Sequence, residues 1–143
     1  MSILTEIFVA RPEDALEFDR LARVGVVPEA RFKRIRFGGL INLQFEILWA
    51  ILEKCEWDPN VHKMEMVLLD DNGEVWLFKF PDKFLDSLIE LKSDEKQDVL
   101  SAWAAAEEMN ADPSDVEPVL EGLITLALAA KGKGENLYLW GSL

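Results

Sequence analysis

The sequence predicts an α+β fold, a single domain in which a mostly antiparallel sheet is backed by about four to five helices. The chain has 143 residues, half of them hydrophobic, which suits one domain with a well-filled core. Residues 63–80 predict a β-hairpin, because two β-rich runs flank a turn-forming cluster. Both ends of the chain resemble strands, and terminal strands stay ordered mainly where a sheet holds them. We therefore expect residues 1–143 to form one domain.

The first elements along the chain are a strand, a short helix and a loop. Residues 3–10 (ILTEIFVA) are β-rich. Pro12, with acidic residues directly behind it, is typical of the first turn of a helix. Residues 24–30 (VGVVPEA) contain the glycine and the proline of a loop.

A basic segment at residues 31–40 (RFKRIRFGGL) resembles a second strand. Ile35 and Phe37 share one face of this strand, whereas Phe32 lies on the other face with two arginines. The four basic residues within six positions fit either an anion-binding strand or a charged edge strand that pairs with the protein's own acids. The second arrangement is the commoner one, because charged side chains protect exposed sheet edges.

The middle of the chain predicts a helix, the hairpin and a second helix. Residues 41–57 form the first helix, with Asn42 as its N-cap. A short helix over residues 82–91 follows the hairpin. In the helix over residues 41–57, the apolar positions that recur at helical spacing are Leu48, Ile51, Leu52 and Cys55.

The C-terminal part predicts two more helices and a final strand. One helix spans residues 93–109, and the next spans residues 112–134 with Asp112 as its cap. The second of them is apolar on all sides from Leu123 onward, so we expect it to be the most buried helix. Residues 135–143 (ENLYLWGSL) end the chain as a strand. In the helix over residues 93–109, the apolar stripe consists of Val99, Trp103, Ala106 and Met109.

The negative charge is concentrated beyond the first forty residues. The net charge is −12; residues 1–40 carry seven basic and six acidic residues, whereas residues 41–143 carry eight and twenty-one. Between Lys96 and Lys131 there are seven acids and no base. Such a surface repels phosphate backbones, so nucleic-acid binding is not expected. It is able to attract a basic protein partner, and the simpler alternative is that the charge only maintains solubility.

Three features predict a cytoplasmic protein that does not enter a membrane. A single cysteine forms no intramolecular disulfide, so nothing indicates an oxidising compartment. The N-terminus lacks the basic and apolar regions of a signal peptide. The longest apolar run, residues 123–130, is far shorter than the ~20 residues of a membrane span.

Residues 70–73 (DDNG) are the most obvious cluster of metal-ligating side chains. With Gly73 as the sixth residue of a calcium loop, the first and last ligand positions would be Leu68 and Lys79, neither of which offers a side-chain oxygen. Asn-Gly is also the dipeptide that tight hairpins require. We therefore interpret this cluster as the turn of the hairpin.

The single cysteine and the single histidine do not assemble a four-ligand Cys/His zinc site. Cys55 and His62 form a conceivable catalytic pair, but Cys55 belongs to an apolar helical stripe, where a buried and inert thiol is the usual finding. No serine lies in a nucleophile-elbow pattern, and no glycine-rich nucleotide fingerprint occurs. The sequence predicts no metal, no cofactor and no catalytic residue, and it favours a protein that is not an enzyme.

The strongest candidates for a binding surface lie on the acidic C-terminal helices. Our leading hypothesis is a non-enzymatic module whose acidic helical face meets a basic partner. The alternative is a small-molecule-binding domain or enzyme with a Trp-lined pocket, since Trp103 and Glu107 would be neighbours on one helix face. A third hypothesis is a homo-oligomer formed through an edge strand, with the basic residues 31–36 of one subunit against acids of another. The candidate binding residues are Trp103, Glu107, Glu108, Asp112, Asp115, Glu117 and Glu121.

Three C-terminal stretches resemble a known group of proteins. WAAAEEM (residues 103–109), LITLALAAKGKG and the terminal NLYLWGSL are similar to segments of small, acidic, uncharacterised bacterial proteins of a domain-of-unknown-function family. The resemblance covers roughly the C-terminal third of the chain, and its motifs are packing motifs. It implies a bacterial cytosolic α+β protein and assigns no active residue. In size and charge such proteins are similar to immunity proteins that neutralise toxins.

Overall fold

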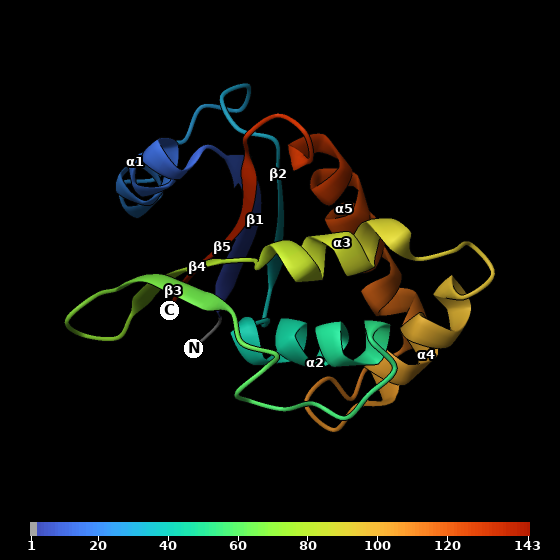
Figure 1. Ribbon diagram of the computed structural model, residues 1–143. Coiled ribbons are helices and arrows are strands. Elements are labelled where there is room, and N and C mark those ends of the chain that lie inside the picture. The colour runs from blue at the N-terminus through green and yellow to red at the C-terminus, as the bar shows by residue number, and fades with distance from the viewer. Residues whose placement is uncertain (1–2) are drawn as a thin grey trace.

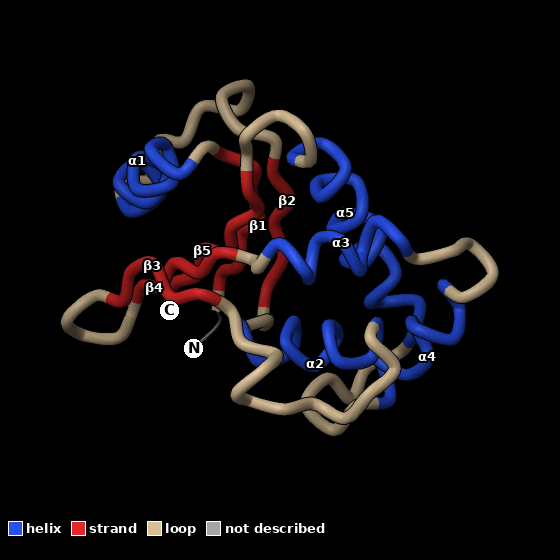
Figure 2. Tube along the Cα trace, viewed as in Figure 1, coloured by secondary structure: helices blue, strands red, loops and turns tan. Residues whose placement is uncertain are grey.

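A computed structural model describes residues 3–143 and contains five strands and five helices (Figures 1 and 2). The order β-α-β-α-β-β-α-α-α-β agrees with the order expected from the sequence and confirms the α+β class. The strands are β1 (Leu4–Ala10), β2 (Arg34–Gly38), β3 (Glu65–Leu69), β4 (Val75–Lys79) and β5 (Asn136–Ser142). The helices are α1 (Pro12–Arg23), α2 (Asn42–Leu52), α3 (Asp82–Glu90), α4 (Lys96–Ala105) and α5 (Pro113–Ala130).

The five strands form one antiparallel sheet in the order β2-β1-β5-β4-β3. Both terminal strands lie inside it, and β5 occupies the centre, with Tyr138 opposite Phe8 of β1 on one side and opposite Lys79 of β4 on the other. Both β1 and β5 are therefore hydrogen-bonded to a neighbouring strand on each side, as expected for terminal strands that a sheet holds. β2 and β3 are the two edges of the sheet.

The sheet lies between two unequal helical layers. Helices α2 to α5 cover one face, and α1 covers the other (Figure 1). Consecutive residues of β5 therefore point into different cores: Leu139 packs beneath the four helices, whereas Trp140 faces α1. Because both faces of the central strands are covered, β1 and β5 read as nearly continuous apolar runs.

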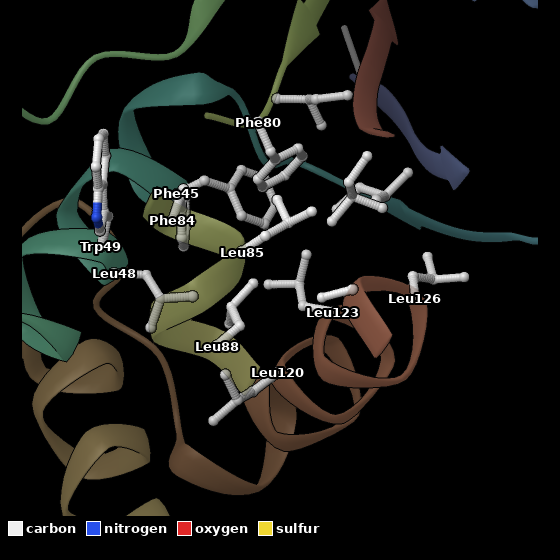
Figure 3. Close-up of a cluster of buried hydrophobic side chains, with 14 of the residues drawn as sticks. Phe45, Leu48, Trp49, Phe80, Phe84, Leu85, Leu88, Leu120, Leu123 and Leu126 are labelled. Carbon is white, nitrogen blue, oxygen red and sulfur yellow. The ribbon is translucent and has the colours of Figure 1, made fainter. Parts of the chain in front are cut away.

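The larger core joins aromatic side chains of α2 and α3 to leucines of α5 (Figure 3). Trp49 and Phe84 stack with their rings 5.5 Å apart, and Phe45 packs edge-on against Phe80 at 5.7 Å. Burying each such side chain contributes about 1.5–3 kcal/mol. These contacts join α2 and α3 to the sheet and fix the surface that the helices present to solvent.

The smaller core lies under α1. Phe18 of this helix stacks on Phe8 with ring centroids 3.7 Å apart, and Phe32 meets both rings edge-on. The indole of Trp140 donates a hydrogen bond to Asp19, whose carboxylate also accepts from Arg23. Phe32 therefore lies on the face opposite Ile35, as the sequence pattern predicts.

Helix α2 is shorter than expected, ending at Leu52 instead of residue 57. Lys54 adopts a left-handed conformation with φ of 58°, and the amide of Cys55 bonds back to the carbonyl of Ala50. This is the usual left-handed helix stop, made here without glycine, so the sequence carries no glycine signal for it. The expectation that Cys55 is a buried helical residue is wrong, because it lies beyond the helix and is exposed.

The other end of α2 also differs from the sequence-based expectation. The N-cap is Ile41 instead of Asn42, and the side-chain oxygen of Gln44 accepts a hydrogen bond from the Ile41 amide at 2.9 Å. That bond is the return half of a capping box, in which a residue inside the helix satisfies the cap's own amide. The helix therefore begins at the predicted place, with a different residue as its cap.

Helix α4 spans ten residues, from Lys96 to Ala105, within the predicted range of 93–109. The chain leaves the helix at Ala106, whose ψ is 140°, and then turns through Asn110 at φ 42°. Glu107 is therefore not one helical turn from Trp103, and the expectation that they share a helix face is wrong. The repeated alanines favour a helix by propensity, but they carry no signal for where it stops.

Helix α5 begins as expected, with the Asp112 side chain accepting a hydrogen bond from the Ser114 amide at 3.0 Å. It is not buried on all sides: Leu123 is fully buried, whereas Leu128 is 56% exposed. The helix approaches β2 so closely that a Cβ at Gly122 would lie 2.6 Å from the Ile35 side chain. Over residues 3–143, no helix combines the length and the apolar character needed to cross a bilayer.

Candidate functional site

The six acidic residues that the sequence assigns to a binding face are all exposed. Helix α5 and the segment leading into it bring them to the surface, because the buried side of α5 faces the sheet, α3 and α4. The six residues are Glu107 and Glu108 in the α4–α5 connection, Asp112 at the N-cap of α5, and Asp115, Glu117 and Glu121 on the helix.

Trp103, the seventh candidate, does not belong to this surface. Its side chain is fully buried, and its indole N–H donates to the carbonyl of Gln44 at 2.9 Å. The ring packs 6.0 Å from that of Phe45 in the larger core. Trp103 holds α4 against α2, and no part of it is free to contact a ligand.

Two of the six carboxylates already have partners within the protein. Asp112 accepts from the amide and the hydroxyl of Ser114, and these hydrogen bonds hold the pKa of its carboxyl below the usual range. Glu121 forms an ion pair with Lys96 at 2.9 Å. Across residues 3–143, no basic side chain lies within ion-pair distance of the remaining four: Glu107, Glu108, Asp115 and Glu117.

The basic residues of the N-terminal part are largely neutralised by their own neighbours. Arg34 pairs at 3.2 Å with Glu6, whose side chain is 3% exposed, and Arg36 approaches the same carboxylate at 3.7 Å. Arg20 binds Glu17 with two hydrogen bonds and holds the pKa of that carboxyl at about 2. The reading of β2 as a charged edge strand that pairs with the protein's own acids therefore accounts for these arginines.

A cleft that the sequence did not reveal lies between the C-terminal end of α2 and helices α3 and α4. It has a volume of about 450 Å³, with Leu52 and Val99 among its apolar lining and the carboxylates of Glu90, Glu95 and Asp98 around it. Its walls come from three helices, so no local pattern could indicate it. Its three carboxylates lie on α3 and at the start of α4, ahead of the connection that carries Glu107 and Glu108.

One basic residue reaches into this cleft. Lys54, in the turn after α2, pairs with Glu95 at 3.0 Å, and that contact lowers the pKa of the Glu95 carboxyl. The pair closes the space between α2 and the start of α4. Asp98, one helical turn further along α4, is exposed.

The histidine and the cysteine come together with Glu53 just after α2. Within residues 3–143 this is the one group of three metal-ligating side chains whose ligand atoms all lie within 4.8 Å of one another. His62 is 2% exposed; its Nε2 lies 2.8 Å from Glu53 and 3.5 Å from the Cys55 sulfur. The Asp58 amide donates to Nδ1 at 3.0 Å.

This hydrogen bond decides the chemistry of the cluster. A neutral imidazole that accepts at Nδ1 carries its proton on Nε2, so Nε2–H donates to the Glu53 carboxylate. Nε2 then has no lone pair with which to bind a metal or to take a proton from Cys55. A metal-bound histidine normally donates from its other nitrogen, and here that nitrogen faces a donor. The hydrogen bonds of His62 to Glu53 and Asp58 therefore hold the loop of residues 53–62 in place.

The acidic cluster at residues 70–73 is the turn of the β3–β4 hairpin, as expected. The Asp70 carboxylate accepts hydrogen bonds from the amides of Glu74 and Val75, at 2.7 and 3.1 Å. Gly73 has a φ of 68°, which glycine adopts without strain. The Asp70 carboxylate is therefore used in building the turn.

Comparison of the chain with protein families, with curated proteins and with solved structures gave no match. The fold and the surface define an acidic α+β domain, and the chemistry of its own residues is the basis for assigning a function. The resemblance to a domain-of-unknown-function family stays a prediction.

Proposed function

We propose that this protein is a non-enzymatic binding module that presents an acidic helical face to a basic protein partner, in the manner of an immunity or inhibitor protein. The observation that carries the proposal is the set of unpaired, exposed carboxylates on α5 and the connection before it. The N-terminal arginines, by contrast, are largely paired with their own acids. The excess negative charge therefore points outward from the helical side.

The arrangement of these carboxylates suits a partner more than a small ligand. Glu107 and Glu108 are exposed on the connection between α4 and α5, and Asp115 and Glu117 follow on the first turns of α5. Exposed charges of one sign accelerate the encounter with a partner of opposite charge and are screened by salt. Binding through this face will therefore weaken as ionic strength rises.

The histidine gives separate support to a non-enzymatic role. It is the residue most often used as a general base near neutral pH. His62 is buried, its Nδ1 is occupied by a backbone amide, and its Nε2–H is directed at Glu53. A residue bonded in this way is suited to holding a loop in place.

The test is affinity capture from a native bacterial lysate at low and high salt. The bait is compared with a variant in which the four unpaired carboxylates are neutralised: Glu107→Gln, Glu108→Gln, Asp115→Asn and Glu117→Gln. A matched control neutralises four exposed acids elsewhere: Glu13→Gln, Glu56→Gln, Glu74→Gln and Asp94→Asn. We expect a basic protein that is retained at low salt, lost at high salt, lost with the variant and retained with the control. Capture of no partner, or of partners insensitive to both salt and the variant, would refute the proposal.

A further inference from the structure

The two edges of the sheet are built very differently. β2 carries arginines that are paired with Glu6, and α5 packs closely against it at Gly122. β3, at the other edge, exposes three large apolar side chains: Met66 at 58%, Val67 at 41% and Leu69 at 50%. Unpaired strand edges are normally protected by charge or by covering elements, so an apolar edge indicates a surface that is covered by something else.

The sheet face beside β3 is also incompletely covered. Figure 1 shows the β3–β4 hairpin projecting from the sheet, away from α4 and α5. An apolar groove of about 220 Å³ lies where α2 begins, lined by Ile41, Asn42, Leu69, Trp76 and Phe78. Met66 and Leu69 pair across the hairpin with Phe78 and Trp76, so they extend the same apolar face to the edge of the sheet.

Trp76 provides the floor of this groove. Its ring lies directly over Gly141 of β5, where a Cβ would come within 2.2 Å of the indole nitrogen. The indole N–H is buried and has no hydrogen-bond partner among residues 3–143. Burying the indole N–H without a hydrogen-bond partner costs stability, and the apolar ring lines the groove beside the open edge.

The charges that flank β3 indicate which occupant fits. Lys63 precedes the strand, whereas Asp71 follows it, and both are exposed. The other two acids of this segment already have partners within the chain, because Glu65 pairs with Lys79 of β4 at 3.7 Å and Asp70 accepts hydrogen bonds from amides of its own turn. A second β3 strand running antiparallel places the basic end of each copy beside the acidic end of the other, at two equivalent positions. A parallel copy would set like charges beside each other. The pattern is therefore self-complementary in the way a two-fold interface requires.

We propose that a second copy of this chain docks antiparallel along β3, so that the apolar side chains of the two edges cover each other and the sheet continues across the dimer. This surface lies away from the acidic helical face, so one protomer is able to form the dimer while its helices bind a partner. The groove beside Trp76 and Phe78 then receives apolar side chains from the neighbouring edge.

A β-bulge in β3 limits the backbone pairing between the two copies. The register between β3 and β4 shifts between Met66 and Leu68, so Val67 has no opposite residue in the hairpin. Bulges increase local twist and interrupt the regular ladder, so backbone pairing between two such edges is short. Apolar contact supplies most of the attraction, and the dimer dissociates on dilution.

Sedimentation velocity over a wide range of protein concentration tests the dimer. We expect the unaltered protein to shift from monomer to dimer as concentration rises. The double variant Met66→Lys/Leu69→Lys should stay monomeric, and its folding should be normal because both side chains are exposed. The control Leu16→Lys/Leu128→Lys alters two equally exposed leucines elsewhere and should still dimerise. A protein that is monomeric throughout, or a dimer that the β3 variant leaves intact, would overturn the proposal.

A charge-reversal pair tests the antiparallel orientation. Lys63→Glu places two acids together at each contact, and Asp71→Lys places two bases together, so each variant alone should dimerise at least several-fold more weakly. Mixing the two variants restores opposite charges at both contacts, and we expect a heterodimer to form. No gain on mixing would overturn the antiparallel arrangement. Circular dichroism of each variant alone confirms that it is folded.

Discussion

At the scale of single residues, the environment of Cys55 and His62 shows what the sequence could and could not predict. The chain's single cysteine and histidine exclude a four-ligand Cys/His zinc site in one copy. The predicted burial of Cys55 is wrong, because α2 ends at Leu52 and the chain turns at Lys54, which has a left-handed conformation. Glycine is the usual residue at such a stop, and the sequence has none there. The backbone hydrogen bond that fixes the His62 tautomer depends on the fold of the loop, so the sequence could not supply it.

The tautomer of His62 predicts that zinc does not stabilise this protein. Binding would require Nε2 to lose its proton and its bond to Glu53, while Nδ1 still faces the Asp58 amide. We expect Tm to be the same with zinc and with a chelator, and Cys55→Ser to leave it unchanged because the thiol is exposed. Differential scanning calorimetry measures both. A zinc-dependent rise in Tm that Cys55→Ser abolishes would contradict this assignment.

Adding a single methyl group at Gly141 is expected to lower the stability of the fold markedly. An alanine Cβ there would overlap the Trp76 indole, with 2.2 Å to its nitrogen and 2.5 Å to the adjacent ring carbon. Overpacking of this kind typically costs about 1–3 kcal/mol. We expect Gly141→Ala to lower the free energy of unfolding by that amount, measured by urea denaturation.

The control for this prediction removes the overlapping ring. Trp76→Leu opens space above residue 141, so adding Gly141→Ala to it should cost much less than it does in the unaltered protein. Equal costs in the two backgrounds would show that the indole is not the cause.

At the scale of elements, the order of helices and strands was predictable and several of their ends were not. Apolar periodicity, β-rich composition, the residues typical of helix starts and the Asn-Gly turn are all local features of the sequence, and together they placed all ten elements. Helix α4 stops early because Ala106 turns into an extended conformation, while the residues after it pack back on α4 through Ala111, whose amide bonds to Ala104. Such a stop depends on tertiary contacts, which alanine-rich sequence does not reveal.

The cap of α5 is an element-scale feature with a pH dependence. Asp112 accepts from Ser114 in the folded state, and its folded pKa therefore lies below its unfolded value. A carboxyl with a depressed folded pKa stabilises the protein above its unfolded pKa, and that contribution disappears as pH falls through the folded pKa. We expect Asp112→Ala to lower Tm at neutral pH and to have little effect in strong acid.

Asp112→Asn is the control, because asparagine caps helices nearly as well as aspartate but does not ionise. Its Tm at neutral pH should lie close to that of the unaltered protein and above that of Asp112→Ala. Thermal unfolding followed by circular dichroism at neutral and strongly acidic pH checks both variants. A deficit for Asp112→Ala that is the same at both pH values would show that the carboxylate charge plays no part.

At the scale of the whole molecule, the distribution of charge could be predicted from the sequence and the shape of the surface could not. The base-free stretch predicted an acidic face, and its six carboxylates are exposed. Trp103 was a candidate for a pocket with Glu107, because helical spacing gives neighbours but does not say which side of a helix is buried. The cleft among α2, α3 and α4 and the uncovered β3 edge arise from packing between distant segments, which no local pattern contains.

A face kept acidic for binding should be a source of instability in the isolated protein. Glu107, Glu108, Asp115 and Glu117 have no basic partner within residues 3–143, and the chain carries a net charge of −12. Like charges repel over about 10 Å at 0.1 M salt and over longer distances at lower salt. We expect the four-carboxylate variant to unfold at a higher temperature than the unaltered protein at low salt, and at the same temperature at high salt.

Glu6→Gln is the contrasting variant for this prediction, because it neutralises a buried carboxylate that is paired with arginines. The Glu6 side chain is 3% exposed and contacts Arg34 and Arg36. Removing its charge leaves the nearly buried Arg34 guanidinium with only the exposed Glu29 carboxylate, 3.7 Å away, as an ionic partner. That variant should be less stable than the unaltered protein, and salt should not erase the difference, because buried pairs are poorly screened. Thermal unfolding of the three proteins at two ionic strengths separates the two kinds of charge. If neutralising the four surface carboxylates also destabilised the protein, these carboxylates would be supporting the fold, and the acidic face would lose its interpretation as a surface reserved for a partner.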